Sequence, residues 1–423
     1  MSKVIKSNFI NPVSEENVEV LRKGFLQIDD NGNIITLQQD RPNLQNGDKL
    51  IELEDKVIIP GFIDVHLHLP QYQFLGEGKD TELLLWLDEH AFPAESSFEY
   101  PDLAEIVARN FFEDLLSHGT TTASIYSTIH EEATNRAFKV AYDKGIRAFI
   151  GKVMMDTNSP PQLTEKVSKS LDASLRLAGE WDKKDNGRLR YIFTPRFVPT
   201  CTGELLRKVG ELINSNGTYA QTHLSENIGE IEFVKELHPW AKSYTHVYER
   251  YGLLGEKVIM AHCIHLSDEE VKLLKETKTN IAHCPYSNEN LRSGVMPYFR
   301  WKDRGLTMAL GTDIAGGPSI SMPEQMGKAI ETSRNFQDGR VISPTEAFYL
   351  ATLGGARVLS IDNVTGNLEA GKEADFVVID PKRIGIDISK GLDLRILGNL
   401  AAIRGNGFIG QTYVRGKQVY SRK

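Results

Sequence analysis

Eight short apolar segments, separated by stretches with helical spacing, constrain the fold of this 423-residue chain most strongly. Each is rich in aliphatic and β-branched residues, as expected of strands that are buried on both faces. They lie at residues 62–67, 121–126, 148–154, 189–194, 219–223, 258–262, 281–283 and 308–311, with amphipathic patterns such as 102–117, 164–178 and 268–276 between them. This alternation predicts an α/β fold, a (β/α)8 TIM-like barrel, over residues 61–361.

The two ends of the chain show a different sequence pattern, in which short predicted strands alternate with clusters of turn residues. Residues 24–28 and 34–37 flank the turn sequence Asp29-Asp30-Asn31-Gly32-Asn33, which predicts a hairpin. Further strands are expected at 374–380 and within 408–420. We therefore expect residues 1–60 and 362–423 to pair into one small β domain, a β-sandwich, with the barrel inserted between them.

Histidines and acids gather at the carboxyl ends of the predicted barrel strands, where barrel enzymes hold their active sites. His66 and His68 end the first strand and point to the same face, because positions i and i+2 of a strand do so. A lone His-x-His is as readily two ordinary histidines at a strand end. Together with His223 and Asp313 at other strand ends, however, the pair predicts a metal site.

Other residues at these strand ends suit proton transfer. Glu226 follows His223 by three residues and could move a proton from a metal-bound water to a substrate; alternatively it is a helix N-terminal acid. His262 is either a satisfied core histidine or a group that orients the water. Asp313 can bind metal and also accept a proton, whereas His283 is expected to be structural or to support a ligand.

Composition excludes several classes of protein. The net charge of −8 argues against a nucleic-acid-binding or anionic-membrane-binding surface. The N-terminal residues lack the apolar core of a signal peptide, and no apolar run is long enough to span a membrane. The three cysteines include no C-x-x-C pair and are typical of a reducing compartment, so we expect a cytoplasmic protein.

Several motifs resemble those of the amidohydrolase superfamily and, within it, its guanine-deaminating members. The superfamily motifs are residues 60–68, His223, His262, 311–313, 351–356 and 366–375. The more distinctive stretches are residues 68–72, 84–87 with 92–95, 151–156, 194–197, 223–227 and 283–288. The resemblance covers nearly the whole chain.

The resemblance implies hydrolysis of a C–N bond in a cyclic amidine, converting guanine to xanthine and ammonia. One zinc ion, with iron as the alternative, would be held by His66, His68, His223 and Asp313. Glu226 would be the proton shuttle and His262 would assist the zinc-activated water. Gln71, Arg196 and Phe197 would bind the base, since guanine offers O6 and N7 to a guanidinium fork and a face for stacking. It also implies a homodimer.

One feature bears on the number of metals. Binuclear relatives bridge two metals with a modified lysine, usually at the fourth strand, which here ends in Thr194-Pro195-Arg196-Phe197. Lys152, in the third strand, is expected to be structural, so one metal is predicted.

Two alternatives for function and two for local structure stay open. The chain could be a sister aminohydrolase that acts on another nucleobase, a modified guanine or a triazine, or a non-catalytic relative that kept the barrel for assembly. Residues 77–98 could form a lid or part of an interface, and Trp86 could close over the base or be core packing.

Overall fold

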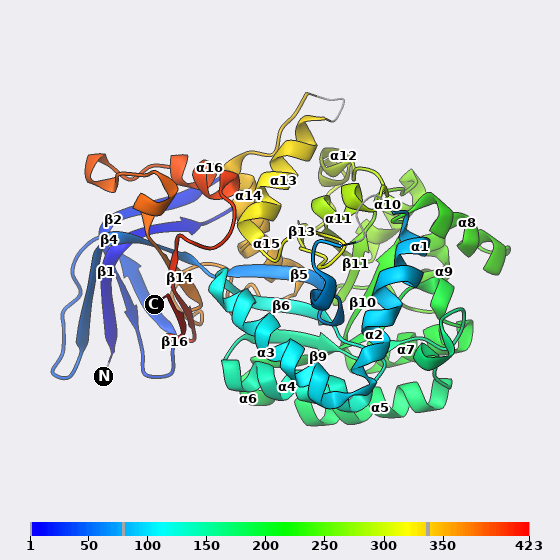
Figure 1. Ribbon diagram of the computed structural model, residues 1–423. Coiled ribbons are helices and arrows are strands. Elements are labelled where there is room, and N and C mark those ends of the chain that lie inside the picture. Colours follow the sequence, from blue (N-terminus) through cyan, green and yellow to red (C-terminus); the bar gives the residue numbers. More distant parts are fainter. Residues whose placement is uncertain (1, 78–80, 336–338, 423) are drawn as a thin grey trace.

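The computed structural model describes residues 2–77, 81–335 and 339–422. A barrel occupies one side of the molecule and a separate sheet the other (Figure 1). The barrel strands are β5 (Phe62–His68), β6 (Thr120–Tyr126), β7 (Arg147–Gly151) with β8 (Val153–Met154), β9 (Leu189–Pro195), β10 (Tyr219–Leu224), β11 (Val258–His262), β12 (Asn280–His283) and β13 (Met308–Leu310). All eight predicted strands are present, which confirms the predicted (β/α)8 TIM-like barrel.

Parallel pairing joins each barrel strand to the next, and the ring closes between β13 and β5. There the Asp313 N–H donates to the His66 carbonyl at 2.8 Å, and the His68 N–H donates to the Ile314 carbonyl at 3.2 Å. The third predicted strand is divided at Lys152 into β7 and β8. Closure matters for function because it brings Asp313, late in the chain, against the histidines of β5.

Helices surround the barrel and bury the outer faces of its strands. The longer ones are α3 (Pro101–Ser117), α4 (Glu131–Lys144), α5 (Val167–Trp181), α7 (Gly203–Asn216), α8 (Ile228–Leu237), α10 (Asp268–Glu276) and α13 (Met322–Arg334). Shorter ones are α6 (Lys184–Gly187), α9 (Tyr244–Arg250), α11 (Pro285–Asn290), α12 (Tyr298–Asp303), α14 (Pro344–Leu350) and α15 (Leu353–Val358). An inner core that includes Ile63, Val65 and Ile259 fills the barrel itself. No helix in the described ranges is long and apolar enough to cross a membrane.

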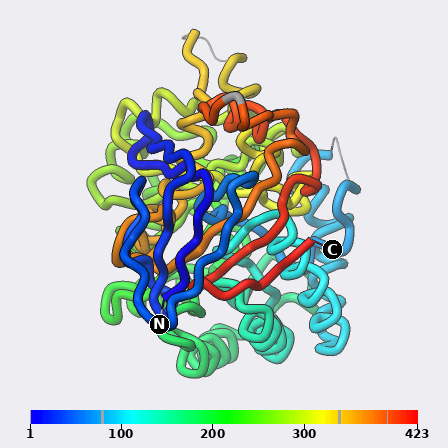
Figure 2. Tube along the Cα trace, turned by 90° about the vertical axis from the view of Figure 1, so that its left-hand side faces the viewer, coloured from blue at the N-terminus to red at the C-terminus, as the bar shows by residue number. Residues whose placement is uncertain are grey.

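Strands from both chain ends form one seven-stranded sheet, in the order β16-β15-β14-β4-β1-β2-β3. They are β1 (Lys3–Pro12), β2 (Val18–Ile28), β3 (Ile34–Gln38), β4 (Lys49–Pro60), β14 (Phe376–Ile379), β15 (Ile409–Val414) and β16 (Lys417–Ser421). Figure 2 shows the blue N-terminal strands beside the orange and red C-terminal ones. The predicted hairpin is β2 with β3. Helix α16 (Arg395–Ala402), which lies between β14 and β15 in the sequence, packs on α13 of the barrel.

A buried ion-pair cluster joins the small sheet to the barrel. Arg147, the first residue of β7, donates to the Asp375 carboxylate at 2.9 and 3.1 Å and to the Glu373 carboxylate. Asp375 also accepts from the Arg415 N–H at 2.8 Å. Because this cluster lies at the amino ends of the barrel strands, it belongs to the stabilising face rather than to the catalytic face.

Candidate active site

Strand β5 brings both of its histidines into the barrel through a local irregularity. Ile63 and Val65 face the inner core, whereas Phe62 and Leu67 face the outer core. Simple alternation after Val65 would send His66 outward. The β5–β6 register shifts between Asp64 and Leu67, as at a β-bulge, so His66 and His68 both turn inward.

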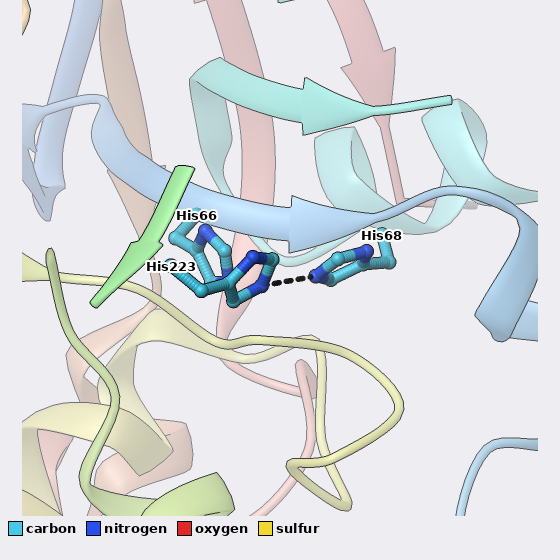
Figure 3. Close-up of side chains that lie close together, drawn as sticks. All are labelled: His66, His68 and His223. Atoms are coloured by element: carbon cyan, nitrogen blue, oxygen red, sulfur yellow. Dashed lines mark hydrogen bonds between the residues drawn. The ribbon is translucent and has the colours of Figure 1, made fainter. Parts of the chain in front are cut away.

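Four ligand-type side chains converge at the carboxyl end of the barrel. His66 and His68 from β5 lie with His223 from β10, as Figure 3 shows, and Asp313 follows β13. Asp313 Oδ1 is 3.2 Å from His66 Nε2 and 3.4 Å from His68 Nε2, and His223 Nε2 is 3.3 Å from His68 Nε2. Two atoms bound tetrahedrally to one zinc at about 2.0 Å would lie about 3.3 Å apart. The four side chains therefore fit a single small divalent metal ion.

The protonation states of these residues suit metal binding. Burial holds the pKa of His68 and His223 well below the ordinary value and lowers that of His66, which favours the neutral form of imidazole that binds metals. For Asp313 burial acts in the opposite direction, but His66 and the other imidazoles hold the carboxyl pKa well below its usual range. His223 Nδ1 donates to the Arg196 carbonyl at 2.7 Å, which leaves Nε2 free to bind a metal. Within the described ranges, the buried His66 Nε2 forms no hydrogen bond, and its 3.2 Å distance from Asp313 Oδ1 is that of two atoms able to share one metal ion.

Glu226 and His262 form a second pair beside the cluster. Glu226 Oε2 lies 3.3 Å from His262 Nε2, and His262 Nε2 lies 3.7 Å from Asp313 Oδ2. Burial raises the pKa of Glu226 to about 7, although His262 opposes the shift. Burial also opposes protonation of His262, but the Glu226 and Asp313 charges raise its pKa.

The backbone is strained at three of these strand ends. Ser225, His262 and Asp313 have φ values of 48°, 71° and 47°, in the left-handed region that non-glycine residues rarely adopt. Such residues collect at active sites because the surrounding fold enforces them. These residues end or follow β10, β11 and β13, three of the strands that supply site residues.

The segment that contains α11 holds three site residues through hydrogen bonds that sequence analysis missed. Ser287 Oγ donates to Asp313 Oδ2 at 2.5 Å, and Ser293 Oγ donates to Glu226 Oε1 at 3.1 Å. Asn288 Oδ1 accepts from His262 Nδ1 at 2.8 Å. Ser287 and Asn288 belong to the distinctive stretch 283–288, but neither that resemblance nor their position after a barrel strand reveals which partner each side chain would meet.

A small cavity opens onto this cluster of ligand-type side chains. Gln71, Arg196 and Phe197, the predicted base-binding residues, line it together with His68, His223, Glu226, His262, Leu291 and Asp313. All three predicted residues are buried. The Gln71 Oε1 already accepts from the Ala315 N–H at 3.0 Å, so its amide group is available chiefly as a donor.

The described part of residues 77–98 forms a wall of this cavity. It contains α1 (Leu83–Trp86), a π-helical turn η2 (Leu87–Ala91) and α2 (Phe92–Ser96), while residues 78–80 lie outside the described ranges. Pro93 cannot donate a helical hydrogen bond, which accounts for the widened turn before it. Leu83, Trp86 and Leu87 line the cavity. Their i, i+3, i+4 spacing was a signal for one helix face, though not for what that face covers.

Two predicted candidates lie away from the cluster. His283 stacks on Tyr298, with ring centroids 6.1 Å apart, and lines a separate hollow outside the barrel wall. Burial lowers its pKa to about 3. Lys152 is fully buried and donates to the Glu165 carboxylate and to Ser170 Oγ.

Comparisons with known proteins agree with this architecture. The amidohydrolase family model matches residues 57–419. The guanine deaminase of Dictyostelium discoideum is 39% identical over 90% of this chain and 89% of its own length. Among solved structures, E. coli guanine deaminase superposes with a TM-score of 0.94 at 34% identity, over 100% of both chains. The C. acetobutylicum guanine deaminase with guanine bound in its active site has a TM-score of 0.93 at 33% identity, over 99% of this chain and 100% of its own. The chain therefore belongs to the amidohydrolase family, and these relatives within it are guanine deaminases.

Proposed function

We propose that this chain hydrolyses guanine to xanthine and ammonia. The observation that carries the proposal is that one cavity is lined by three of the four ligand-type residues (His68, His223 and Asp313), by the Glu226–His262 pair and by Gln71, Arg196 and Phe197. The first two suit metal-assisted attack of water, and the third suits recognition of a planar base with acceptor atoms. Similarity to guanine deaminases over nearly the whole chain supports guanine as that base.

We infer one metal ion, zinc, bound by His66, His68, His223 and Asp313. The 3.2–3.4 Å separations of their ligand atoms support this assignment, and iron is the alternative with a similar ligand preference. When bound, zinc would lower the pKa of a water molecule towards about 7 and so provide a nucleophile at neutral pH. Lys152 is engaged by Glu165 and offers no bridge to a second metal.

Glu226 is the proposed proton shuttle. Its carboxylate takes one proton from the attacking water and delivers it to a ring nitrogen of guanine. It then takes the second proton from the oxygen now bonded to C2 and delivers it to the departing amine, which leaves a C=O group at C2. At C2 a C–O bond forms and the C–N bond to the amino group breaks, which gives xanthine and ammonia. A carboxyl pKa near 7 suits a group that must both accept and donate.

His262 and Asp313 orient the attacking water. Because Asn288 Oδ1 can only accept, the hydrogen on His262 lies on Nδ1, and Nε2 faces Glu226 and Asp313. Asp313 presents Oδ1 to His66 and His68, while Ser287 holds its Oδ2. The two side chains thereby give the water a fixed set of partners beside Glu226.

On the other side of the cavity, three residues bind the base. Arg196 offers guanidinium donors to O6 and N7, Phe197 offers a ring face for stacking, and the Gln71 amide supplies a further donor. A base with a donor at position 6, such as adenine, would place that donor against the Arg196 donors. This arrangement favours guanine over the related aminohydrolase substrates.

Ammonia release from guanine, adenine, cytosine, 8-oxoguanine and melamine tests the proposal, before and after chelation. We expect turnover of guanine to xanthine, its loss on chelation and its return with zinc at one equivalent per chain. Turnover of another base without guanine would show that the pocket residues were misassigned. Two metal equivalents, with activity following the second, would contradict the single site.

Two further properties belong to the proposal. Three buried cysteines, Cys201, Cys263 and Cys284, are free thiols, which supports a reducing, cytoplasmic location. The sequence resemblance supports a homodimer, and light scattering coupled to size-exclusion chromatography would measure the mass in solution.

A further inference from the structure

Glu95, in α2, is a buried carboxylate that sequence analysis gave no role in the site. Its side chain is only 1% exposed. Both of its oxygens accept from Arg196 Nη1, at 2.6 Å for Oε1 and 2.5 Å for Oε2, although the two residues are 101 positions apart in sequence. A buried guanidinium without such a partner would be strongly unfavourable, so the pair holds Arg196 in one place.

Helix α2 contacts Arg196 in a second way and is itself tied to the barrel. The Phe92 ring centroid lies 5.3 Å from Arg196 Cζ, at cation–π distance. The Glu95 carbonyl accepts from Thr128 Oγ1 at 3.1 Å, just beyond β6. Glu95 therefore reaches Arg196 from a backbone that the barrel fixes, rather than from a free loop.

Glu95 engages one nitrogen of the Arg196 guanidinium, Nη1, and does not engage the other two, Nε and Nη2. Within the described ranges, every side-chain hydrogen bond of Arg196 leaves from Nη1, and Nε and Nη2 bond to no protein atom. Arg196 lines the cavity beside Phe197. Because the guanidinium is planar and rigid, fixing Nη1 also fixes the direction in which the remaining donors point.

Glu95 lies close to the other polar side chain of the base-binding wall as well. Gln71 Nε2 is 3.5 Å from Glu95 Oε1, while the Ala315 N–H holds Gln71 Oε1 at 3.0 Å. One carboxylate thus contacts both polar groups that we assign to the base. The contact at 3.5 Å is at the outer limit of a hydrogen bond, so Arg196 is the main partner.

We propose that Glu95 is a positioning residue that sets specificity for a 6-oxo purine by fixing the direction of the Arg196 donors. This inference rests on the proposed function. The O6 and N7 atoms of guanine form a pair of acceptors that matches two coplanar donors. A purine with hydrogen at C6 keeps N7 but loses the second acceptor, so it gains less from a fixed Arg196.

A substrate pair that differs in the C6 oxygen, together with the N1 hydrogen that accompanies it, tests this role. Guanine and 2-aminopurine carry the same leaving amine at C2. For the metal-loaded protein we expect kcat/KM to favour guanine, and Glu95→Gln to lower kcat/KM for guanine about 10- to 100-fold while changing that for 2-aminopurine less than about 3-fold. Glu95→Asp keeps the charge and should restore part of the ratio. Glu99→Gln, an exposed change in the same segment, should leave the ratio unaltered.

Direct binding gives a second measurement that needs no turnover. Calorimetry can compare hypoxanthine, which has O6, with purine, which lacks it. In Glu95→Gln the ratio of their binding affinities should move towards one, as the ratio of the kcat/KM values does. If kcat/KM or affinity falls equally for both members of each pair, so that their ratio stays unchanged, the positioning role is overturned. If the wild-type protein releases no ammonia from guanine, the proposed function fails; if it does and the ratios stay constant, only the Glu95 inference fails.

Discussion

Asp64 accepts two hydrogen bonds from Thr312 across 248 positions of sequence, one from the backbone N–H at 3.0 Å and one from Oγ1 at 2.5 Å. Asp64 Oδ1 also accepts from the His66 N–H at 3.2 Å. The carboxylate therefore ties the start of the bulge in β5 to the residue before Asp313. Two ligand-bearing segments, far apart in sequence, are held in register by one buried side chain.

The junction between β13 and β5 also leaves no room for a side chain at Gly311. A Cβ there would lie 2.8 Å from His66 Cβ and 3.1 Å from the His66 N and O atoms. We predict that Gly311→Ala separates β13 from β5, displaces His66, and lowers both the metal content and the melting temperature. Metal analysis and calorimetry would measure these effects.

Gly179→Ala is the matched control for that variant. Gly179 is exposed in α5, and an added Cβ there meets nothing within 4 Å. The change should stabilise the helix slightly, by about 0.5–1 kcal/mol. Full metal occupancy in Gly311→Ala would show that the junction between β13 and β5 can relax without displacing the proposed metal ligands.

Glu226→Gln should separate proton transfer from metal binding. The amide keeps the size of the side chain and can still accept from Ser293, but it cannot carry a proton. We expect kcat to fall roughly 10²- to 10⁴-fold, with one metal per chain retained. His223→Ala, by contrast, should lose metal and activity together. Undiminished turnover in Glu226→Gln would assign the shuttle to another group.

Asn288 should govern activity through the orientation of His262. Asn288→Ala removes the acceptor for His262 Nδ1 and allows the ring to rotate or change tautomer, so kcat should fall about 10- to 100-fold with little change in KM. Asn288→Asp keeps an acceptor oxygen and should retain more activity than the alanine variant. Equal activity in the two variants would mean that the hydrogen bond to His262 does not matter for turnover.

Acid stability should depend on the Arg147 cluster. Burial opposes ionisation of Glu373, but Arg147 and Arg415 lower its pKa below the ordinary 4.5. A carboxyl with a lowered folded-state pKa stabilises the protein above its unfolded-state pKa, and this stabilisation is lost as pH falls through the folded-state value. Glu373→Gln should therefore lower stability at neutral pH and weaken its decline below about pH 4.5.

Urea unfolding across pH 3–7 would measure that decline, with Glu236→Gln as a control at an exposed carboxyl. A pH dependence identical in Glu373→Gln and the wild-type protein would remove Glu373 from the account of acid sensitivity.

Local patterns in the sequence determined the strands and the chemistry that they carry. Apolar runs between helical stretches identified all eight barrel strands, since burial on both faces leaves a mark in each strand separately. His66, His68, His223 and Asp313 were placed at strand ends, and a barrel brings strand ends together whatever the details of packing. That these four side chains would lie together was therefore predictable before the tertiary structure was known.

Only the tertiary structure decided how those side chains are aimed and held. The bulge in β5 sets the direction of both histidines, because a slip of one residue reverses the face of every later side chain in a strand. The contacts of Glu95 with Arg196, Asn288 with His262 and Asp64 with Thr312 join separate segments. Such pairs depend on barrel closure and on the packing of α2 and α11 above it, neither of which leaves a periodic signal in the sequence.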